Sequence, residues 1–152
     1  MYQYQLIPVA QMHSIIPLLQ LLNKELEVTI IQQRLDEMLT RGYECLGVYD
    51  EDQLIGICGL WLLTKIYAGR HIEPDNVCIH PDYRNKGVGE AMMHWVDEYA
   101  RSKGCIASEL NAYVVNKKAH KFWLRQGYEI IGFHFIKKLY QSTPHIKMLV
   151  QQ

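Results

Sequence analysis

The chain has 152 residues, of which 49% are hydrophobic and 21% are charged, with 16 basic and 16 acidic side chains. We expect one domain over residues 1–152, because this length suffices to bury a substantial core. The composition argues against a disordered chain, and the balanced charge argues against a broadly basic nucleic-acid surface.

Targeting and membrane signals are missing from the sequence pattern. The start, Met-Tyr-Gln-Tyr-Gln, has no basic segment followed by an apolar one, and no apolar run approaches the roughly 18 residues of a membrane span. We therefore expect a cytoplasmic protein that does not bind membranes.

The cysteines and histidines are scattered along the chain. The four cysteines form no C-x-x-C pair, and three lie in apolar, strand-like runs, which favours buried reduced thiols. They are Cys45, Cys58, Cys78 and Cys105. The seven histidines form no cluster with metal-ligand spacing, so we predict no metal site.

Hydrophobic periodicity in the first half of the chain predicts helices that alternate with strands. Residues 2–7 alternate as a strand, and residues 9–22 have helical spacing, although Pro17 weakens a continuous helix. The next predicted elements are a helix over 29–40, two hairpin strands over 43–49 and 53–64, and a strand over 71–80. Pro74 removes one ladder donor from this last strand, which predicts a bulge or an edge there.

The second half continues the alternation. From Glu90 an amphipathic helix runs to a Lys103-Gly104 stop, and Asn116 is well placed to cap a later helix that ends near Gln126. The predicted strands cover residues 105–115, 128–132 and 133–139, the last two as a hairpin. The whole pattern indicates an α/β or α+β sheet domain.

Residues 84–89 read R-N-K-G-V-G, between the extended run Val77-Cys78-Ile79 and the helix from Glu90. Glycines allow a tight turn and close backbone approach, and the first-turn amides of a helix attract anions. The spacing matches neither a dinucleotide fingerprint nor a P-loop. We therefore expect a phosphate-bearing ligand of a class that neither of these two motifs binds.

Two segments together carry a family resemblance. Residues 77–89 contain R-x-x-G-x-G after a strand, and N-x-x-A-x-x-F-W-x-x-x-G-Y follows from Asn116. In this order they resemble the GNAT superfamily of acetyl-CoA-dependent N-acetyltransferases, over roughly residues 53–139. The resemblance implies an acyltransferase with acetyl-CoA as cosubstrate. It also implies a GNAT-like α/β fold with a mixed central sheet of about six to seven strands and about four helices.

The resemblance also implies a set of CoA contacts. The turn amides would hold the pyrophosphate, the strand backbone would pair with the pantetheine arm, and the later segment would complete the site. These residues are Arg84, Asn85, Lys86, Gly87, Val88 and Gly89; Val77, Cys78 and Ile79; and Asn116, Ala119 and Trp123. The alternatives are a solvated basic turn and an ordinary core strand.

Acetyl transfer to an amine needs a group that removes a proton. His71, Glu73 and Asp75 are the nearby candidates, and Glu73 lies where some family members carry a strand glutamate as general base. We predict Glu73, then Asp75, as catalytic, with solvent-facing carboxylates as the alternative.

Trp123 falls where the family often has a tyrosine that protonates the departing thiolate. An indole cannot serve as that acid, so Trp123 is either a wall of the channel or a core aromatic. This departure motivates a second hypothesis, a non-catalytic CoA-binding or regulatory module.

The leading hypothesis is direct transfer of acetyl from acetyl-CoA to the amine of a small molecule or peptide. A nucleic-acid partner ranks last, because the charge is balanced. The aromatic-rich C-terminal region suggests a possible homodimer.

Overall fold

A computed structural model of the chain describes residues 1–139. Two compact units are distinguished, Met1–Leu110 and a second that begins at Asn111. One domain over residues 1–152 stays a prediction.

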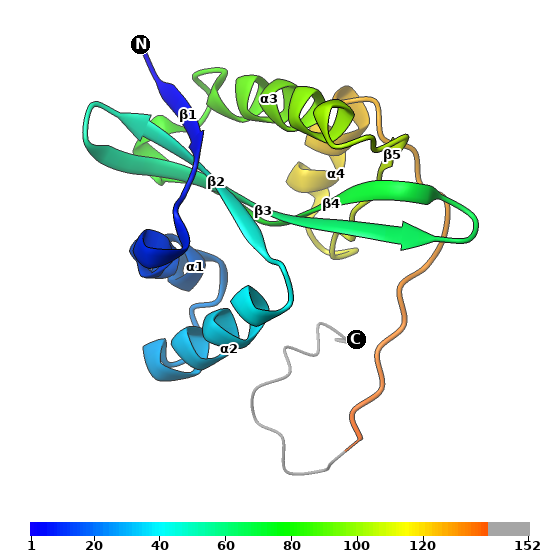
Figure 1. The fold of residues 1–152 in the computed structure, drawn as a ribbon, viewed down its shortest axis with the longest axis horizontal. Helices are drawn as coiled ribbons and strands as arrows, with labels where there is room; N and C mark the ends of the chain where they lie inside the picture. The colour runs from blue at the N-terminus through cyan, green and yellow to red at the C-terminus, as the bar shows by residue number, and fades with distance from the viewer. Residues whose placement is uncertain (140–152) are drawn as a thin grey trace. The chain divides into compact units, whose positions relative to one another are not determined.

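The first unit is built on a five-stranded sheet in the order β1-β2-β3-β4-β5 (Figure 1). The pairs β1–β2, β2–β3 and β3–β4 are antiparallel, whereas β5 runs parallel to β4. The strands are β1 Gln3–Leu6, β2 Glu44–Asp50, β3 Gln53–Lys65, β4 Gly69–Ile79 and β5 Ala107–Ser108. The predicted mixed sheet is confirmed, with fewer strands than the six to seven expected.

Helices cover both faces of this sheet (Figure 1). α1 (Ile16–Leu22) and α2 (Val28–Thr40) lie on one face, and α3 (Val88–Ser102) lies on the other. The helix predicted over residues 9–22 is divided into a 3₁₀ helix, η1 (Val9–Ile15), and α1. Pro17 is the reason: it occupies the first turn of α1, where a missing N–H breaks no helical hydrogen bond.

A hydrophobic core fixes each helix to its face. α3 buries five side chains, and η1, α1 and α2 bury theirs against β2, β3 and β4. The α3 set is Val88, Met92, Met93, Val96 and Ala100. The opposite core includes Met12, Ile15, Leu18, Leu19, Ile31 and Leu35. Each large apolar side chain buried in this way contributes about 1.5–3 kcal/mol, which holds the strands that carry the candidate site.

β4 is interrupted close to where Pro74 predicts it. Gly59 pairs with Asp75 and Ile57 pairs with Cys78, so Cys58 alone faces the two residues Asn76 and Val77. This is a β-bulge, and Asn76 has the left-handed φ of 51° that such an extra residue can require. Pro74 keeps its pairing with Leu60, so the register changes only beyond it.

β5 is much shorter than the strand predicted over residues 105–115. The carbonyls of Arg70 and Ile72 accept hydrogen bonds from Ile106 and Glu109, so alternate residues of β4 face β5. Pro74 is the next residue on that edge, and it has no N–H to donate. The pairing therefore ends at Glu109.

The second unit contains α4 (Lys117–Arg125), as predicted, with Asn116 as its N-cap. No strand forms over residues 128–139, so the predicted hairpin there is wrong. Its apolar side chains, including Ile130, Phe133 and Phe135, lie exposed. Strand-forming residues without a paired partner strand do not form a ladder, whatever their propensity.

Candidate active site

Three polar side chains follow one face of β4. His71, Glu73 and Asp75 pair with Leu63, Trp61 and Gly59 of β3, and alternation puts them on the same side of the sheet. The two predicted catalytic carboxylates therefore share a face. The bulge at Asn76 interrupts this alternation before Val77, so Val77 does not continue the face that carries Glu73 and Asp75.

Glu73 belongs to a charged cluster at the end of the β3–β4 hairpin. Lys65 Nζ donates to Glu73 Oε1 at 2.5 Å and also to a carboxylate oxygen of Glu109, which follows β5. Tyr67 donates its hydroxyl to the other Glu109 oxygen at 2.5 Å. The Glu73 and Glu109 side chains are each 19% exposed, so solvent reaches both.

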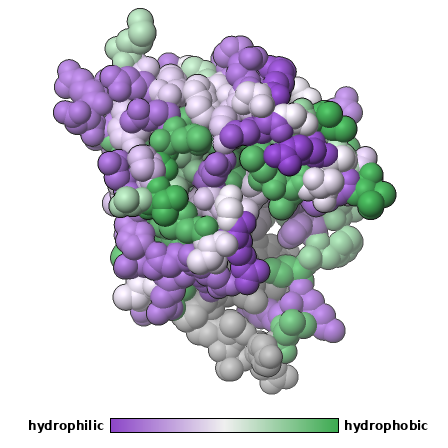
Figure 2. Space-filling model, viewed as in Figure 1, coloured by the Kyte–Doolittle hydropathy of each residue, from purple (hydrophilic) through white to green (hydrophobic). Residues whose placement is uncertain are grey.

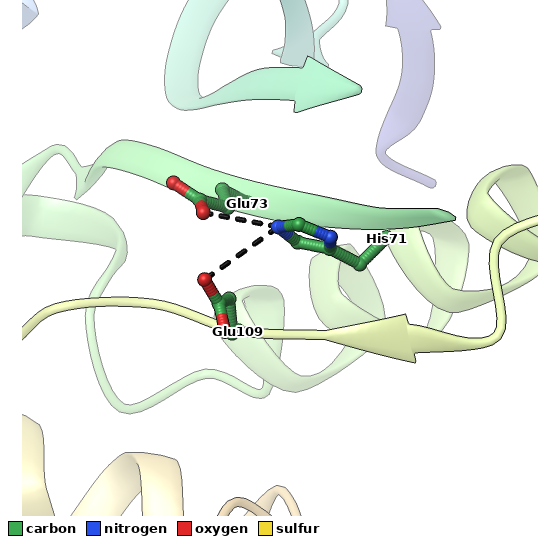
Figure 3. Close-up of side chains that lie close together, drawn as sticks. All are labelled: His71, Glu73 and Glu109. Atoms are coloured by element: carbon green, nitrogen blue, oxygen red, sulfur yellow. Dashed lines mark hydrogen bonds and ion pairs between the residues drawn. The ribbon is translucent and has the colours of Figure 1, made fainter. Parts of the chain in front are cut away.

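His71 lies beneath these carboxylates and is fully buried. Its Nδ1 is 2.9 Å from the Gly69 carbonyl, and its Nε2 is 3.1 Å from Glu73 and 3.5 Å from Glu109 (Figure 3). Both ring nitrogens thus lie within hydrogen-bonding distance of oxygen atoms. His71 therefore contacts the Glu73 carboxylate from within the core.

Hydrogen bonds within the cluster shift the pKa values of Glu109 and Lys65. Hydrogen bonds from Lys65 and then from Tyr67 lower the pKa of Glu109 from its ordinary 4.5 to about 2. The same contacts, first with Glu109 and then with Glu73, raise the pKa of Lys65. Lys65 therefore stays an ammonium and Glu109 a carboxylate near neutral pH.

The sequence did not predict that Glu109 and Lys65 lie beside Glu73. Glu109 lies 36 positions after Glu73 in the numbering, and only the pairing of His71 with Ala107 brings the two carboxylates together. No motif signals such a pairing, because it depends on the register between distant strands.

The same three side chains are the candidate metal ligands among residues 1–139. One donor atom each from His71, Glu73 and Glu109 lies within 4.8 Å of the others. Lys65 is hydrogen-bonded to both carboxylates, so an ammonium already supplies the positive charge that a cation would bring. The absence of a metal stays a prediction.

Substituting Lys65 by Met is expected to destabilise the fold by about 1 kcal/mol near neutral pH, because Glu73 and Glu109 would then face each other without the ammonium. The folded-state pKa of Glu109 lies below its ordinary value, so this stabilisation is present above about pH 4.5 and is lost as the pH falls toward 2. Urea unfolding near pH 7 and pH 3 measures it. The deficit should shrink at the lower pH, whereas Lys103→Met, at the residue that follows α3, should show no such change.

Asp75 is held by an aromatic neighbour. Trp61 Nε1 donates to Asp75 Oδ2 at 3.1 Å, and the Trp61 ring packs against Tyr43 with centroids 5.1 Å apart. Gly59 makes room for Tyr43, since a Cβ there would lie 2.1 Å from its hydroxyl. Burial raises the pKa of Tyr43, which keeps that hydroxyl protonated beside the bulge.

The turn before α3 has the backbone geometry that its glycines predict. Asn85 and Gly87 have left-handed φ values of 60° and 77°, and no side chain caps the helix at Gly87. Val88 is buried as an anchor, and Arg84 Nε donates to the Ile79 carbonyl at 3.0 Å. Uncapped first-turn amides at the end of β4 fit an anion such as a diphosphate.

Other predicted CoA contacts have local structural roles. Lys86 Nζ lies 5.3 Å from the centroid of the Tyr83 ring, and Cys78 is a buried free thiol. Burial raises the pKa of Cys78, which argues against an acyl-carrying thiolate. The predicted role of Cys78 is a contact between its backbone and the pantetheine arm, and this role stays a prediction.

In the second unit, the Asn116 side chain accepts from the Ala119 amide at 3.1 Å. Trp123 packs edge-on against Phe122 and Tyr128, with centroids 4.9 and 5.5 Å away. These rings are only half-buried and α4 buries no side chain, so Trp123 packs against aromatic neighbours but does not lie in a core. CoA contacts by Asn116, Ala119 and Trp123 stay predictions.

Comparison with known proteins decides the family. The model of the acetyltransferase (GNAT) family matches residues 15–128. The chain belongs to this family. The predicted family, its fold class and its acyltransferase enzyme class are thereby confirmed.

Relatives within this family are N-acetyltransferases. The chain is 28% identical over 88 residues to an aminoalkylphosphonate N-acetyltransferase of Salmonella typhimurium, a match that spans 57% of each chain. It is 24% identical over 123 residues to the uncharacterized N-acetyltransferase YhdJ of Bacillus subtilis, covering 80% of this chain and 87% of that one.

A solved structure of AAC(6')-Iy, in complex with a bisubstrate analog of CoA and acetylneamine, has the same fold with a TM-score of 0.78. The sequences are 14% identical, and the match covers 91% of this chain and 98% of that one. GNAT proteins use acetyl-CoA. In residues 1–139, no helix combines the length and apolar character needed to cross a membrane.

Proposed function

We propose that this GNAT protein moves the acetyl group of acetyl-CoA to the amine of a small molecule by direct attack in a ternary complex. The observation that carries the proposal is the β4 bulge, which lies between an uncapped helix N-terminus and a pair of carboxylates. These features supply a place for the donor and a base for the acceptor on one strand.

The donor site rests on the turn and on the open part of β4. The amides of residues 87–89 bind the diphosphate, and Arg84 and Lys86 add positive charge at the turn. β5 stops pairing before Pro74, which leaves the edge beyond it available in the first unit. The pantetheine arm binds along residues 77–79 as an added strand.

Chemistry takes place beside the bulge. Glu73 accepts a proton from the acceptor ammonium, directly or through water, and the neutral amine attacks the thioester carbonyl. An amide near Val77 stabilises the developing oxyanion. The C–N bond forms, the attacking nitrogen loses a second proton, and the C–S bond breaks. CoA leaves as a thiolate that takes up one proton, from a group other than Trp123.

Several observations support a small amine as the acceptor. One relative is named an aminoalkylphosphonate N-acetyltransferase, and the AAC(6')-Iy structure holds an analog that contains acetylneamine. Glu73 and Asp75 provide two carboxylates on one face, which attract an ammonium group.

Release of free CoA thiol, measured with acetyl-CoA and a panel of small primary amines, tests the proposal. We expect amine-dependent thiol release and a stoichiometric amount of N-acetylated product. Binding of acetyl-CoA without turnover on any amine would contradict the proposal and would favour the non-catalytic module.

A further inference from the structure

A groove of about 370 Å³ lies between α2 and β3 in the first unit. It is lined by Arg34, Glu37, Met38, Arg41 and Trp61. The surface over α2 is mainly hydrophilic in Figure 2, at the place where Figure 1 shows this helix. Charged side chains and the apolar Met38 and Trp61 share its lining, so the groove suits a ligand that has both an ionic and an apolar part.

One wall of the groove is a stripe of side chains from α2 and from Arg41, the residue that follows it. Residues 34, 37, 38 and 41 have the spacing that places side chains on one helix face. Two arginines and one glutamate leave this wall with an excess of one positive charge. The excess attracts an anionic group, which a guanidinium binds in a bidentate geometry.

A ligand anion can replace Glu37 in the ion pair between Arg41 and Glu37. Arg41 Nη2 donates to Glu37 Oε1 at 2.7 Å, and these side chains are 70% and 65% exposed. Exposed pairs of this kind contribute little to stability, so a ligand anion can replace Glu37 at Arg41 at small cost.

The opposite wall connects the groove to the proposed base. Trp61 pairs directly with Glu73 across the sheet and donates to Asp75. Side chains of directly paired residues lie about 5 Å apart on the same face, so the carboxylates are one strand away from the groove. A short molecule thus spans from the arginines to Glu73.

We propose that the acceptor carries both a primary amine and an anionic group. This inference rests on the proposed function and names the acceptor class for the same site. The anionic group binds Arg34 and Arg41, the hydrocarbon linker lies against Trp61, and the ammonium group points to Glu73 and Asp75. A carboxylate, a phosphonate and a phosphate share the chemistry that the arginines recognise.

The test compares kcat/KM for short amines that differ in their second group. The anionic probes are 3-aminopropanoate and 2-aminoethylphosphonate, which separate carboxylate from phosphonate recognition. Propylamine and 1,4-diaminobutane are the neutral and cationic probes. We expect the anionic probes to be preferred at least tenfold, as one charge-assisted hydrogen bond of ordinary strength provides.

Variants locate this preference in the groove. Arg34→Gln and Arg41→Gln should each raise KM for the preferred anionic probe about tenfold, leaving kcat and the weak turnover of propylamine nearly unchanged. Arg101→Gln is the matched control, because Arg101 also pairs with a nearby glutamate on an exposed helix face, at 2.5 Å from Glu98. It should change neither parameter.

The possible failures are distinguishable. Equal or better turnover of propylamine or 1,4-diaminobutane would overturn the acceptor class while leaving acetyl transfer intact. An anionic preference that survives both groove substitutions would overturn the site. No turnover of any amine would overturn the proposed function and this inference with it.

Discussion

Glu73→Gln is expected to lower kcat for acetyl transfer by about 100-fold or more, the usual loss when a general base is removed. Glutamine can still accept hydrogen bonds from Lys65 and His71, so the cluster should stay folded. It cannot take a proton from the acceptor ammonium. The pH–rate profile of the variant should lose the limb that reports ionisation of the base, and acetyl-CoA affinity should not change.

Two further variants sharpen this result. Glu98→Gln, at an exposed position on α3, is the control and should keep full activity. Asp75→Asn tests the second predicted carboxylate, which Trp61 binds. An unchanged rate and pH profile in Glu73→Gln, together with a large loss in Asp75→Asn, would transfer the role of base to Asp75.

Gly87→Ala is expected to raise KM for acetyl-CoA at least tenfold, which corresponds to about 1.4 kcal/mol of lost binding. Gly87 has a φ of 77°, and a Cβ there would enter open space before the uncapped amides of α3. That is the space that the proposed diphosphate occupies. The added methyl group also disfavours the backbone conformation that aims these amides outward.

Gly104→Ala separates binding from backbone strain. Gly104 follows the other end of α3, has a φ of 74°, and also has no atom within 4 Å of an added Cβ. Both substitutions should lower stability by about 1–2 kcal/mol through the left-handed conformation. Urea unfolding measures this common loss, and acetyl-CoA titration should show weaker binding for Gly87→Ala alone. Equal acetyl-CoA affinity in the two variants would count against the donor site.

Local signals in the sequence determined most of the elements and the turn. The helix predicted over 29–40 is observed as Val28–Thr40, and Asn116 caps α4 through its side chain. Helical periodicity, caps and glycines with positive φ act over a few residues, so they can be read without a partner segment. A bulge or an edge in β4 was also predicted, because Pro74 lacks a backbone donor wherever it lies, and a bulge is observed just beyond Pro74, which itself stays paired.

Only the tertiary structure decided how long the later strands are and which charges meet. Residues 105–115 have strand-forming character, yet the ladder with β4 is only two residues long. Register between distant segments also brings Glu109 and Lys65 to Glu73 and sets Arg41 opposite Trp61. Pairing and packing depend on which edges and faces are available after folding. The sequence by itself therefore determined the family and the turn before α3, while the fold decided the surroundings of Glu73 and the shape of the groove.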